Sequence, residues 1–389
     1  MDPNSLVDFA PVVRLAGLAL VLAVLPLSWV WLRRRGGSEA AGAAGGRLAA
    51  LTALTMFLTF DLVVFGSFTR LTDSGLGCPD WPGCYGSASP LGASGAIAAA
   101  EQAMPTGPVT WSKAWIEMIH RYLAMTVGVL ILVLAVVSWL ERRALPHSPW
   151  WPTATLVWVI VQGLFGKYTV TLKLYPAIVT LHLLGGLVLL AMLAVQREWY
   201  RARPLPLAPP VRTLAGVALA MLTLQIALGG WVSTNYAVLA CAGFPLCNGQ
   251  WWPATDFASG FTILRELGQR GDGTLLPMEA LVAIHLVHRW FAFVVVAVLV
   301  WLGVRLRREI GGTQRRFGTA LWVLAAAQVA TGLSNVVLDW PIAAALAHAA
   351  LAAGLVLALT LLLVRSSPRL AATSAVNRPP TSRGAARTA

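Results

Sequence analysis

Nine long apolar stretches are the feature that most constrains how this chain folds. Each is close to the roughly 20 residues that cross the hydrocarbon core of a bilayer. Only 12% of the 389 residues are charged, whereas a typical soluble domain has about 25%. We therefore expect an all-α polytopic membrane protein. The stretches lie near 12–32, 48–68, 114–140, 150–172, 175–195, 214–233, 278–304, 317–338 and 342–364.

The basic residues are unevenly placed between these stretches. When the helix ends alternate between two sides of a membrane, most of the 29 Lys and Arg residues fall on one side. Such an excess marks the cytoplasmic face, so the net charge of +13 indicates topology and no nucleic-acid partner is expected. The expected location is a bacterial cytoplasmic (inner) membrane, with the long loops 69–113 and 234–277 on the periplasmic side. The basic face carries Arg33, Arg34, Arg35, Arg47, Arg142, Arg143, Arg197, Arg201, Arg203, Arg212, Arg305, Arg307, Arg308, Arg315, Arg316, Arg365, Arg369, Arg378, Arg383 and Arg387.

The two ends of the chain have their own character. The run 12–32 is followed at once by three arginines, whereas a secretory signal carries its basic cluster before the apolar run. We expect residues 1–47 to form an additional N-terminal transmembrane helix and a cytoplasmic linker. Residues 365–389 are rich in Ser, Pro, Arg and Ala, which predicts a disordered cytoplasmic tail.

An internal repeat organises the rest. The cysteines of CPDWPGC and CAGFPLC have the same spacing, and a histidine followed by arginine comes later in EMIHR and in HLVHR. Gln-x-x-x-Gly occurs three times, and two of these stand twenty residues before a histidine. We expect two copies of a four-helix unit, 48–196 and 214–364, joined by a cytoplasmic linker at 197–213. Because each copy has an even number of helices, both copies enter the membrane from the same side, and we expect a pseudo-two-fold axis along the membrane normal to relate them. Four-helix bundles build cofactor sites from side chains that face inward.

Histidines inside apolar stretches indicate chemistry, because an ionisable residue in a membrane helix is costly. A single histidine of this kind makes a plain interhelical hydrogen bond about as often as it has a functional role. Four of them, however, occupy matching places: His120 and His182 in the first copy, His288 and His348 in the second. In each copy, one histidine lies near the start of the second helix and the other lies early in the fourth helix. These two helices run in the same direction, so the two histidines of a copy are expected to lie at similar depth and can face each other. His147, in LPHSP, is expected to be solvated.

Two facing imidazoles without a nearby acidic or cysteine ligand suit the two axial positions of heme iron. Zinc normally requires a third or fourth protein ligand. We infer two heme sites, one per copy. Arg121 and Arg289 follow a histidine directly and are placed either to pair with heme propionates or to reach the lipid headgroups.

The copies differ three residues before the first histidine of each pair. Glu117 precedes His120, and His285 precedes His288, on the same helical face. A carboxylate beside a heme could exchange protons or stabilise developing positive charge; alternatively, Glu117 pairs with Arg121 at i, i+4. The asymmetry suggests that the first copy does chemistry and the second holds a permanent heme.

All four cysteines lie in the two expected periplasmic loops. Cysteines close in sequence on that side usually oxidise, and the repeat predicts the pairs Cys78–Cys84 and Cys241–Cys247, although other connectivities exist. The pairs are either structural staples or exchange disulfides with partner thiols.

Several motifs together resemble heme A synthase, over residues 48–364. The most specific is Arg70-Leu-Thr-x-Ser-Gly-Leu followed by a cysteine pair. The motifs are FTRLTDSGLGCPDWPGCYG at 68–86, EMIHR at 117–121, LHLLGG at 181–186, HLVHR at 285–289 and LAHAAL at 346–351.

The resemblance implies eight transmembrane helices in two pseudo-symmetric halves and oxidation of the C8 methyl of heme O to a formyl group, giving heme A for terminal oxidases. It places substrate heme O between His120 and His182, with Glu117 important to catalysis. It assigns His288 and His348 to a heme b cofactor and makes the first cysteine pair a functional disulfide. Heme O synthase, cytochrome oxidase assembly factors and membrane lipid are the implied partners, and a homo-oligomer is left open. The N-terminal helix and the second cysteine pair depart from the common family pattern.

Two other functions fit the residues alone. A membrane cytochrome b that passes electrons between quinol and another acceptor would also hold two bis-histidine hemes. A heme transporter would also use parallel repeats, but the presence of Glu117 in one copy disfavours a symmetric transporter.

Overall fold

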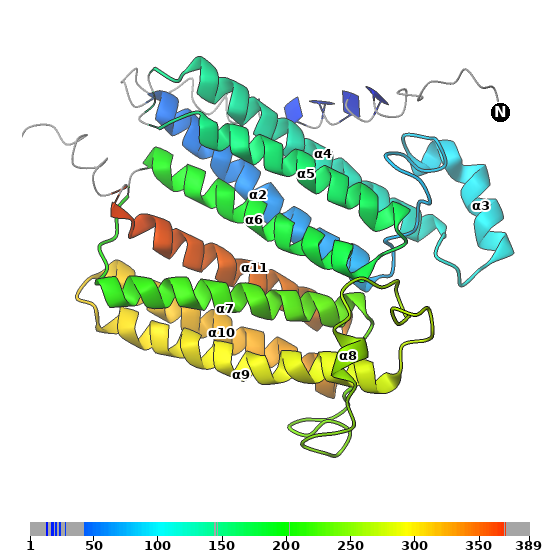
Figure 1. Cartoon of the computed structure of the whole chain (residues 1–389). Coiled ribbons are helices and arrows are strands. Elements are labelled where there is room, and N and C mark those ends of the chain that lie inside the picture. Colours follow the sequence, from blue (N-terminus) through cyan, green and yellow to red (C-terminus); the bar gives the residue numbers. More distant parts are fainter. Residues whose placement is uncertain are drawn as a thin grey trace, which may run out of the picture.

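Eight long helices make up the described part of the computed structural model of the protein (Figure 1). It describes residues 43–368 except 144, 146 and 202, together with residue 370 and isolated positions between 13 and 28. No β-strand occurs in this described part. The long helices are α2 (Ala43–Leu71), α4 (Trp111–Leu140), α5 (Trp150–Thr171), α6 (Pro176–Arg201), α7 (Pro209–Thr234), α9 (Met278–Arg308), α10 (Gly312–Val337) and α11 (Ile342–Arg365), and the loops carry η1 (Pro90–Ala93), α3 (Ser94–Ala103) and α8 (Phe257–Gly260).

Seven of the long helices are apolar and long enough to cross a bilayer, counted over the described residues. The eighth, α5, is not among them, but it packs between α4 and α6 as a full member of the bundle. The prediction of an all-α polytopic membrane protein is confirmed.

Several helices begin at residues that favour a helix start. Thr110 caps α4 by accepting the Lys113 N–H (3.3 Å). Helices α6 and α7 begin with proline, which suits the first helical turn.

The helices form two rings of four in chain order. In the first ring α2 packs on α4, α4 on α5, α5 on α6, and α6 on α2; the second ring repeats this with α7, α9, α10 and α11. The rings meet through α6 with α7, α2 with α11, and α6 with α11. In ring order, α2 corresponds to α7 and α6 corresponds to α11. A pseudo-two-fold axis therefore converts the α6–α7 contact into the α11–α2 contact and relates α6 to α11 across their own contact. Figure 1 shows the two rings stacked, with α2 and α6 facing α7 and α11.

Apolar side chains hold the rings together. Leu187 and Leu190 of α6 are buried against Ala353 of α11, with Phe60 of α2 and Ile226 of α7 beside them. Each ring also has its own leucine-rich cluster. The halves are therefore packed into one body, and a site in either half is positioned by fixed helices.

The segments that flank and join the two halves agree only in part with expectation. The predicted N-terminal helix at 12–32 and the tail at 365–389 fall largely outside the described residues. The expected linker 197–213 is mostly helical, since α6 continues to Arg201 and α7 begins at Pro209.

His147, predicted to be solvated, is half-buried. Its ring lies 5.7 Å from the Trp199 ring, centroid to centroid, and hydrogen-bonds to the Trp199 carbonyl. This burial lowers the pKa of His147. No local pattern indicates this contact, because Trp199 comes from the end of a different helix.

Candidate functional site

Four histidines lie in pairs near one end of the bundle, within the first three turns of α4, α6, α9 and α11. This end carries the cysteine loops, 72–110 and 235–277 (Figure 1). His120 and His182 belong to the first ring of helices, and His288 and His348 belong to the second. All four side chains are half-buried. The structure thus places both members of each predicted pair in the same half, at the end that carries the cysteine loops.

A glycine on the preceding helix makes room for each imidazole. In three of the four cases an added Cβ would meet a ring atom at 3.1 Å or less, and in the fourth at 3.6 Å. A side chain at Gly66, Gly229 or Gly332 would press on the ring, whereas one at Gly166 would make an ordinary van der Waals contact. The contacts are Gly66 with His120, Gly166 with His182, Gly229 with His288, and Gly332 with His348.

His285 is held against the second cysteine loop. It is only 4% exposed. Its Nδ1 lies 2.9 Å from the Ala237 carbonyl oxygen, and its Nε2 accepts the Arg289 Nε–H at 3.2 Å. Both ring nitrogens are therefore engaged by the loop and its arginine, whereas His288 lies beside Gly229 inside the second ring.

The residues fit heme better than a protein-ligated metal ion. Among the described residues, no group of three or more His, Cys, Asp or Glu could hold a metal ion. A heme iron needs only two axial protein ligands, because the macrocycle supplies the others. The Nδ1 atom of His182 is buried without a hydrogen-bond partner, a state that is costly unless a ligand or water engages the ring. Paired half-buried imidazoles with glycine behind them fit a heme in each half.

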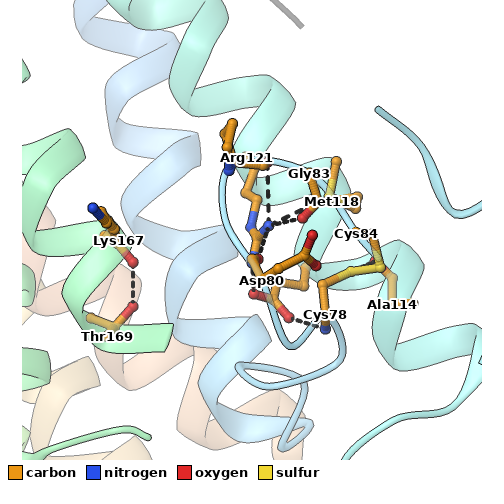
Figure 2. Close-up of polar contacts among 12 residues, drawn as sticks. Cys78, Asp80, Gly83, Cys84, Ala114, Met118, Arg121, Lys167 and Thr169 are labelled. Atoms are coloured by element: carbon orange, nitrogen blue, oxygen red, sulfur yellow. Dashed lines mark hydrogen bonds and ion pairs between the residues drawn. A yellow bond between two sulfur atoms is a disulfide. The ribbon is translucent and has the colours of Figure 1, made fainter. Parts of the chain in front are cut away.

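Glu117 lies beneath the first cysteine loop and is only 4% exposed. Its Oε2 accepts the Cys78 backbone N–H at 2.8 Å, and its Oε1 pairs with Arg121. The same guanidinium donates to three loop carbonyls, those of Asp80 (2.9 Å), Pro82 (3.3 Å) and Gly83. Figure 2 shows Arg121 at the centre of the loop's contacts. The i, i+4 pair considered from the sequence is present, and it ties the carboxylate to the disulfide loop.

In the second half an arginine also holds the cysteine loop through its carbonyls, but no carboxylate of the described residues pairs with it. Arg289 donates to the carbonyls of Gly243 (2.9 Å), Leu246 (3.3 Å) and Cys241. His285 takes the place of Glu117 beside the arginine. Both arginines therefore hold their loops, and contact with heme propionates stays a prediction.

Both predicted disulfides, Cys78–Cys84 and Cys241–Cys247, are present. The first is fully buried against Ile97, Ala114 and Met118. The disulfide thus packs directly on α4, the helix that carries Glu117 and His120.

The sequence does not reveal the contact that Arg70 makes between the halves, although Arg70 belongs to its most specific motif. Arg70 donates to the Tyr236 hydroxyl oxygen and to the Ser233 carbonyl, each at 2.8 Å, and stacks on the Tyr236 ring at 4.0 Å. The Tyr236 hydroxyl in turn donates to Asp73 (2.6 Å). Because 166 residues separate Arg70 from Tyr236, only the packing of the two halves creates this cluster.

Replacing Tyr236 by phenylalanine is expected to lower stability by about 1–2 kcal/mol, since it removes hydrogen bonds to two charged groups at a partly exposed position. The readout is a lower apparent Tm of the detergent-purified protein. Tyr168→Phe is the matched control: Tyr168 is also 44% exposed, and its hydroxyl has no hydrogen bond among the described residues. Equal Tm values for both variants would contradict the role of this cluster.

Known proteins are similar to this chain over a range that includes both histidine pairs and both cysteine loops. The COX15-CtaA family, described as cytochrome oxidase assembly protein, matches residues 49–360. A heme A synthase of Shewanella oneidensis is 36% identical over 321 residues, 80% of this chain and 94% of its own length. The heme A synthase of Rhizorhabdus wittichii is 27% identical over 334 residues, 79% and 90% of the two chains. With this coverage and the paired histidines in place, the chain belongs to the COX15-CtaA family of cytochrome oxidase assembly proteins.

Proposed function

We propose that the protein is a heme A synthase, a membrane enzyme that oxidises the C8 methyl of heme O to a formyl group in successive hydroxylations. The observation that carries this is the pairing of imidazoles in both halves with a carboxylate beside only one pair. A cytochrome that only passes electrons has no use for that asymmetry. The names of the near full-length relatives support the same activity.

The two histidine pairs have different tasks in this proposal. His120 and His182 hold the substrate, heme O, in the half 48–196. His288 and His348 hold a permanent heme b in the half 214–364, where it supplies one-electron transfer.

The protein's own residues position and shield the substrate. Glu117 is fixed between the Cys78 N–H and Arg121, so its carboxylate is held one helical turn from His120 and can take or return a proton. Arg121 holds the first cysteine loop closed over that helix, which excludes water. The N–H groups of Arg121 and Arg289 that the loops leave free are the proposed contacts to heme propionates.

The arginine distribution supports an inner-membrane location with both cysteine loops on the periplasmic side. Heme O synthase would deliver the substrate, assembly factors of cytochrome oxidase would receive heme A, and the apolar outer faces of the helices contact lipid. A homo-oligomer is compatible with these contacts.

The test is to co-express the chain with a heme O synthase and to separate the extracted hemes by chromatography. The wild type is expected to yield heme A, and His120→Ala is expected to yield only heme O. Unchanged heme O with a reducible heme spectrum in the wild type would favour the cytochrome b, and a purified protein without a reducible heme would favour the transporter. Either result overturns the proposal.

A further inference from the structure

Helices α9 and α10 approach each other closely through two glycines, Gly303 and Gly318. An added Cβ at Gly318 would lie 2.7 Å from the Gly303 carbonyl oxygen, and one at Gly303 would collide with the Trp322 indole. The Trp322 Nε1–H donates to the Val300 carbonyl at 3.0 Å. The indole is therefore fixed against α9 by close packing and by a hydrogen bond.

An open apolar groove of about 360 Å³ runs between the two helices beside this indole. Both helices are long and apolar enough to span a bilayer, and Val300, Ala326 and Val329 are exposed along the groove. An occupant of the groove must therefore be apolar over this stretch. The lining residues are Val296, Val300, Trp322, Ala325, Ala326 and Val329.

An arginine lies over the indole, at the end of the bundle opposite the cysteine loops. The Arg307 Cζ is 4.6 Å from the centroid of the Trp322 ring, and its Nη1 donates to the Thr319 hydroxyl at 2.7 Å. None of the ion pairs among the described residues includes Arg307. A guanidinium that is oriented in this way and keeps free N–H groups is a good partner for a phosphate.

The turn between α9 and α10 adds more positive charge. Between residues 305 and 316 the chain has five arginines and one acidic residue, Glu309. All five arginines are exposed. Basic clusters at the end of membrane helices attract anionic lipid headgroups. Besides Arg307, the cluster comprises Arg305, Arg308, Arg315 and Arg316.

The first half differs from the second at the matching positions. The repeat, aligned through the ligand histidines of α4 and α9 and the glycines that face the rings on α5 and α10, places Trp139 at the position of Arg307 and Ile160 at that of Ala326. The Trp139 Nε1–H donates to the Thr153 hydroxyl at 2.9 Å, which matches the contact of Arg307 with its threonine. The second half thus has a cation in place of an indole, and a small side chain in place of isoleucine.

We propose that the groove between α9 and α10 binds a phospholipid with an anionic headgroup. One acyl chain lies along the groove, and the phosphate pairs with Arg307. A zwitterionic lipid would fill the groove equally well but would gain less from the surrounding arginines. A soluble anion would pair with Arg307 but would leave the apolar groove uncovered. The combination of an apolar groove with a free cation beside it therefore favours an anionic lipid.

The test is a lipid titration of the detergent-purified full chain, followed by native mass spectrometry. The two probes are dioleoylphosphatidylglycerol and dioleoylphosphatidylcholine, which share their acyl chains and differ in net charge. We expect the first phosphatidylglycerol to bind the wild type at least about fivefold more tightly than phosphatidylcholine, since one arginine near an anionic headgroup contributes about this factor.

Two variants separate the headgroup from the acyl chain. Arg307→Gln keeps a donor for Thr319 but removes the charge, so it should weaken phosphatidylglycerol about fivefold and leave phosphatidylcholine unchanged. Ala326→Ile installs the first-half residue in the groove and should weaken both lipids by about fivefold or more, because the added side chain occupies the space of the acyl chain.

Each variant has a matched control. Arg142→Gln removes an arginine that lies 5.7 Å from the Trp139 ring centroid at the corresponding end of the first half. Ala320→Ile enlarges an exposed alanine of α10 that does not line the groove. Both controls should bind the two lipids like the wild type.

Equal affinities of the wild type for the two lipids would overturn the proposal. The same holds if Arg307→Gln behaves like Arg142→Gln, or if Ala326→Ile behaves like Ala320→Ile. Because Arg307 is exposed, its variant decides the result even if Ala326→Ile does not fold.

Discussion

A valine at Gly229 should empty the second heme site, and a valine at Gly66 should empty the first. An added Cβ would lie 2.9 Å from His288 Cε1 in one case and 3.0 Å from His120 Nε2 in the other. Overpacking of this kind costs about 1–3 kcal/mol, which is roughly a 5- to 150-fold loss of heme affinity. Gly229→Val is expected to lose the resident heme, measured as pyridine hemochrome. Gly66→Val is expected to keep that heme and to make no heme A.

Two glycines elsewhere in the long helices serve as controls. An added Cβ at Gly216 in α7 or at Gly163 in α5 would meet nothing within 4 Å, so valine there should leave heme content and heme A formation near wild type. If Gly66→Val lost the resident heme, or if Gly216→Val behaved like Gly229→Val, the assignment of one glycine to each ring would be wrong.

Glu117→Gln should abolish heme A formation as completely as Glu117→Ala, while the resident heme stays bound. Glutamine keeps an oxygen that can accept the Cys78 N–H, but it can neither take up a proton nor carry the charge that pairs with Arg121. Loss of general acid–base catalysis typically reduces the rate by about 10²- to 10⁴-fold. Heme A is quantified by chromatography after co-expression with heme O synthase.

Glu141→Gln is the control for this substitution. Glu141 follows the other end of the same helix and pairs with Arg47 at 3.1 Å, so neutralising it should leave heme A formation intact. Substantial heme A from Glu117→Gln, with none from Glu117→Ala, would show that Glu117 only braces the loop.

The histidines and cysteines can be predicted from the sequence because they recur at fixed spacings. Matching positions in two copies identify the imidazole pairs, and the repeated cysteine spacing identifies both disulfides. The same spacing relates Gly66 to Gly229. The contact of these glycines with the rings depends on how adjacent helices pack, which spacing alone does not define.

Contacts that join distant segments cannot be predicted in this way. The sequence places Arg121 and Arg289 near propionates or headgroups, whereas in the structure they hold loop carbonyls, since the loops fold back over α4 and α9. His285 lies on the same helical face as His288, and only the structure shows that its ring bonds to Ala237 and Arg289. Such contacts arise from tertiary folding of long loops, and no local pattern encodes them.

Counting low-spin hemes in single-histidine variants tests the paired-imidazole arrangement most directly. Electron paramagnetic resonance of protein purified with and without a heme O supply should show one bis-histidine signal in both preparations and a second only with heme O. His288→Ala and His348→Ala are expected to remove the first signal, and His120→Ala and His182→Ala the second. A signal that is lost on replacing one histidine from each half, or that survives all four replacements, would contradict the account.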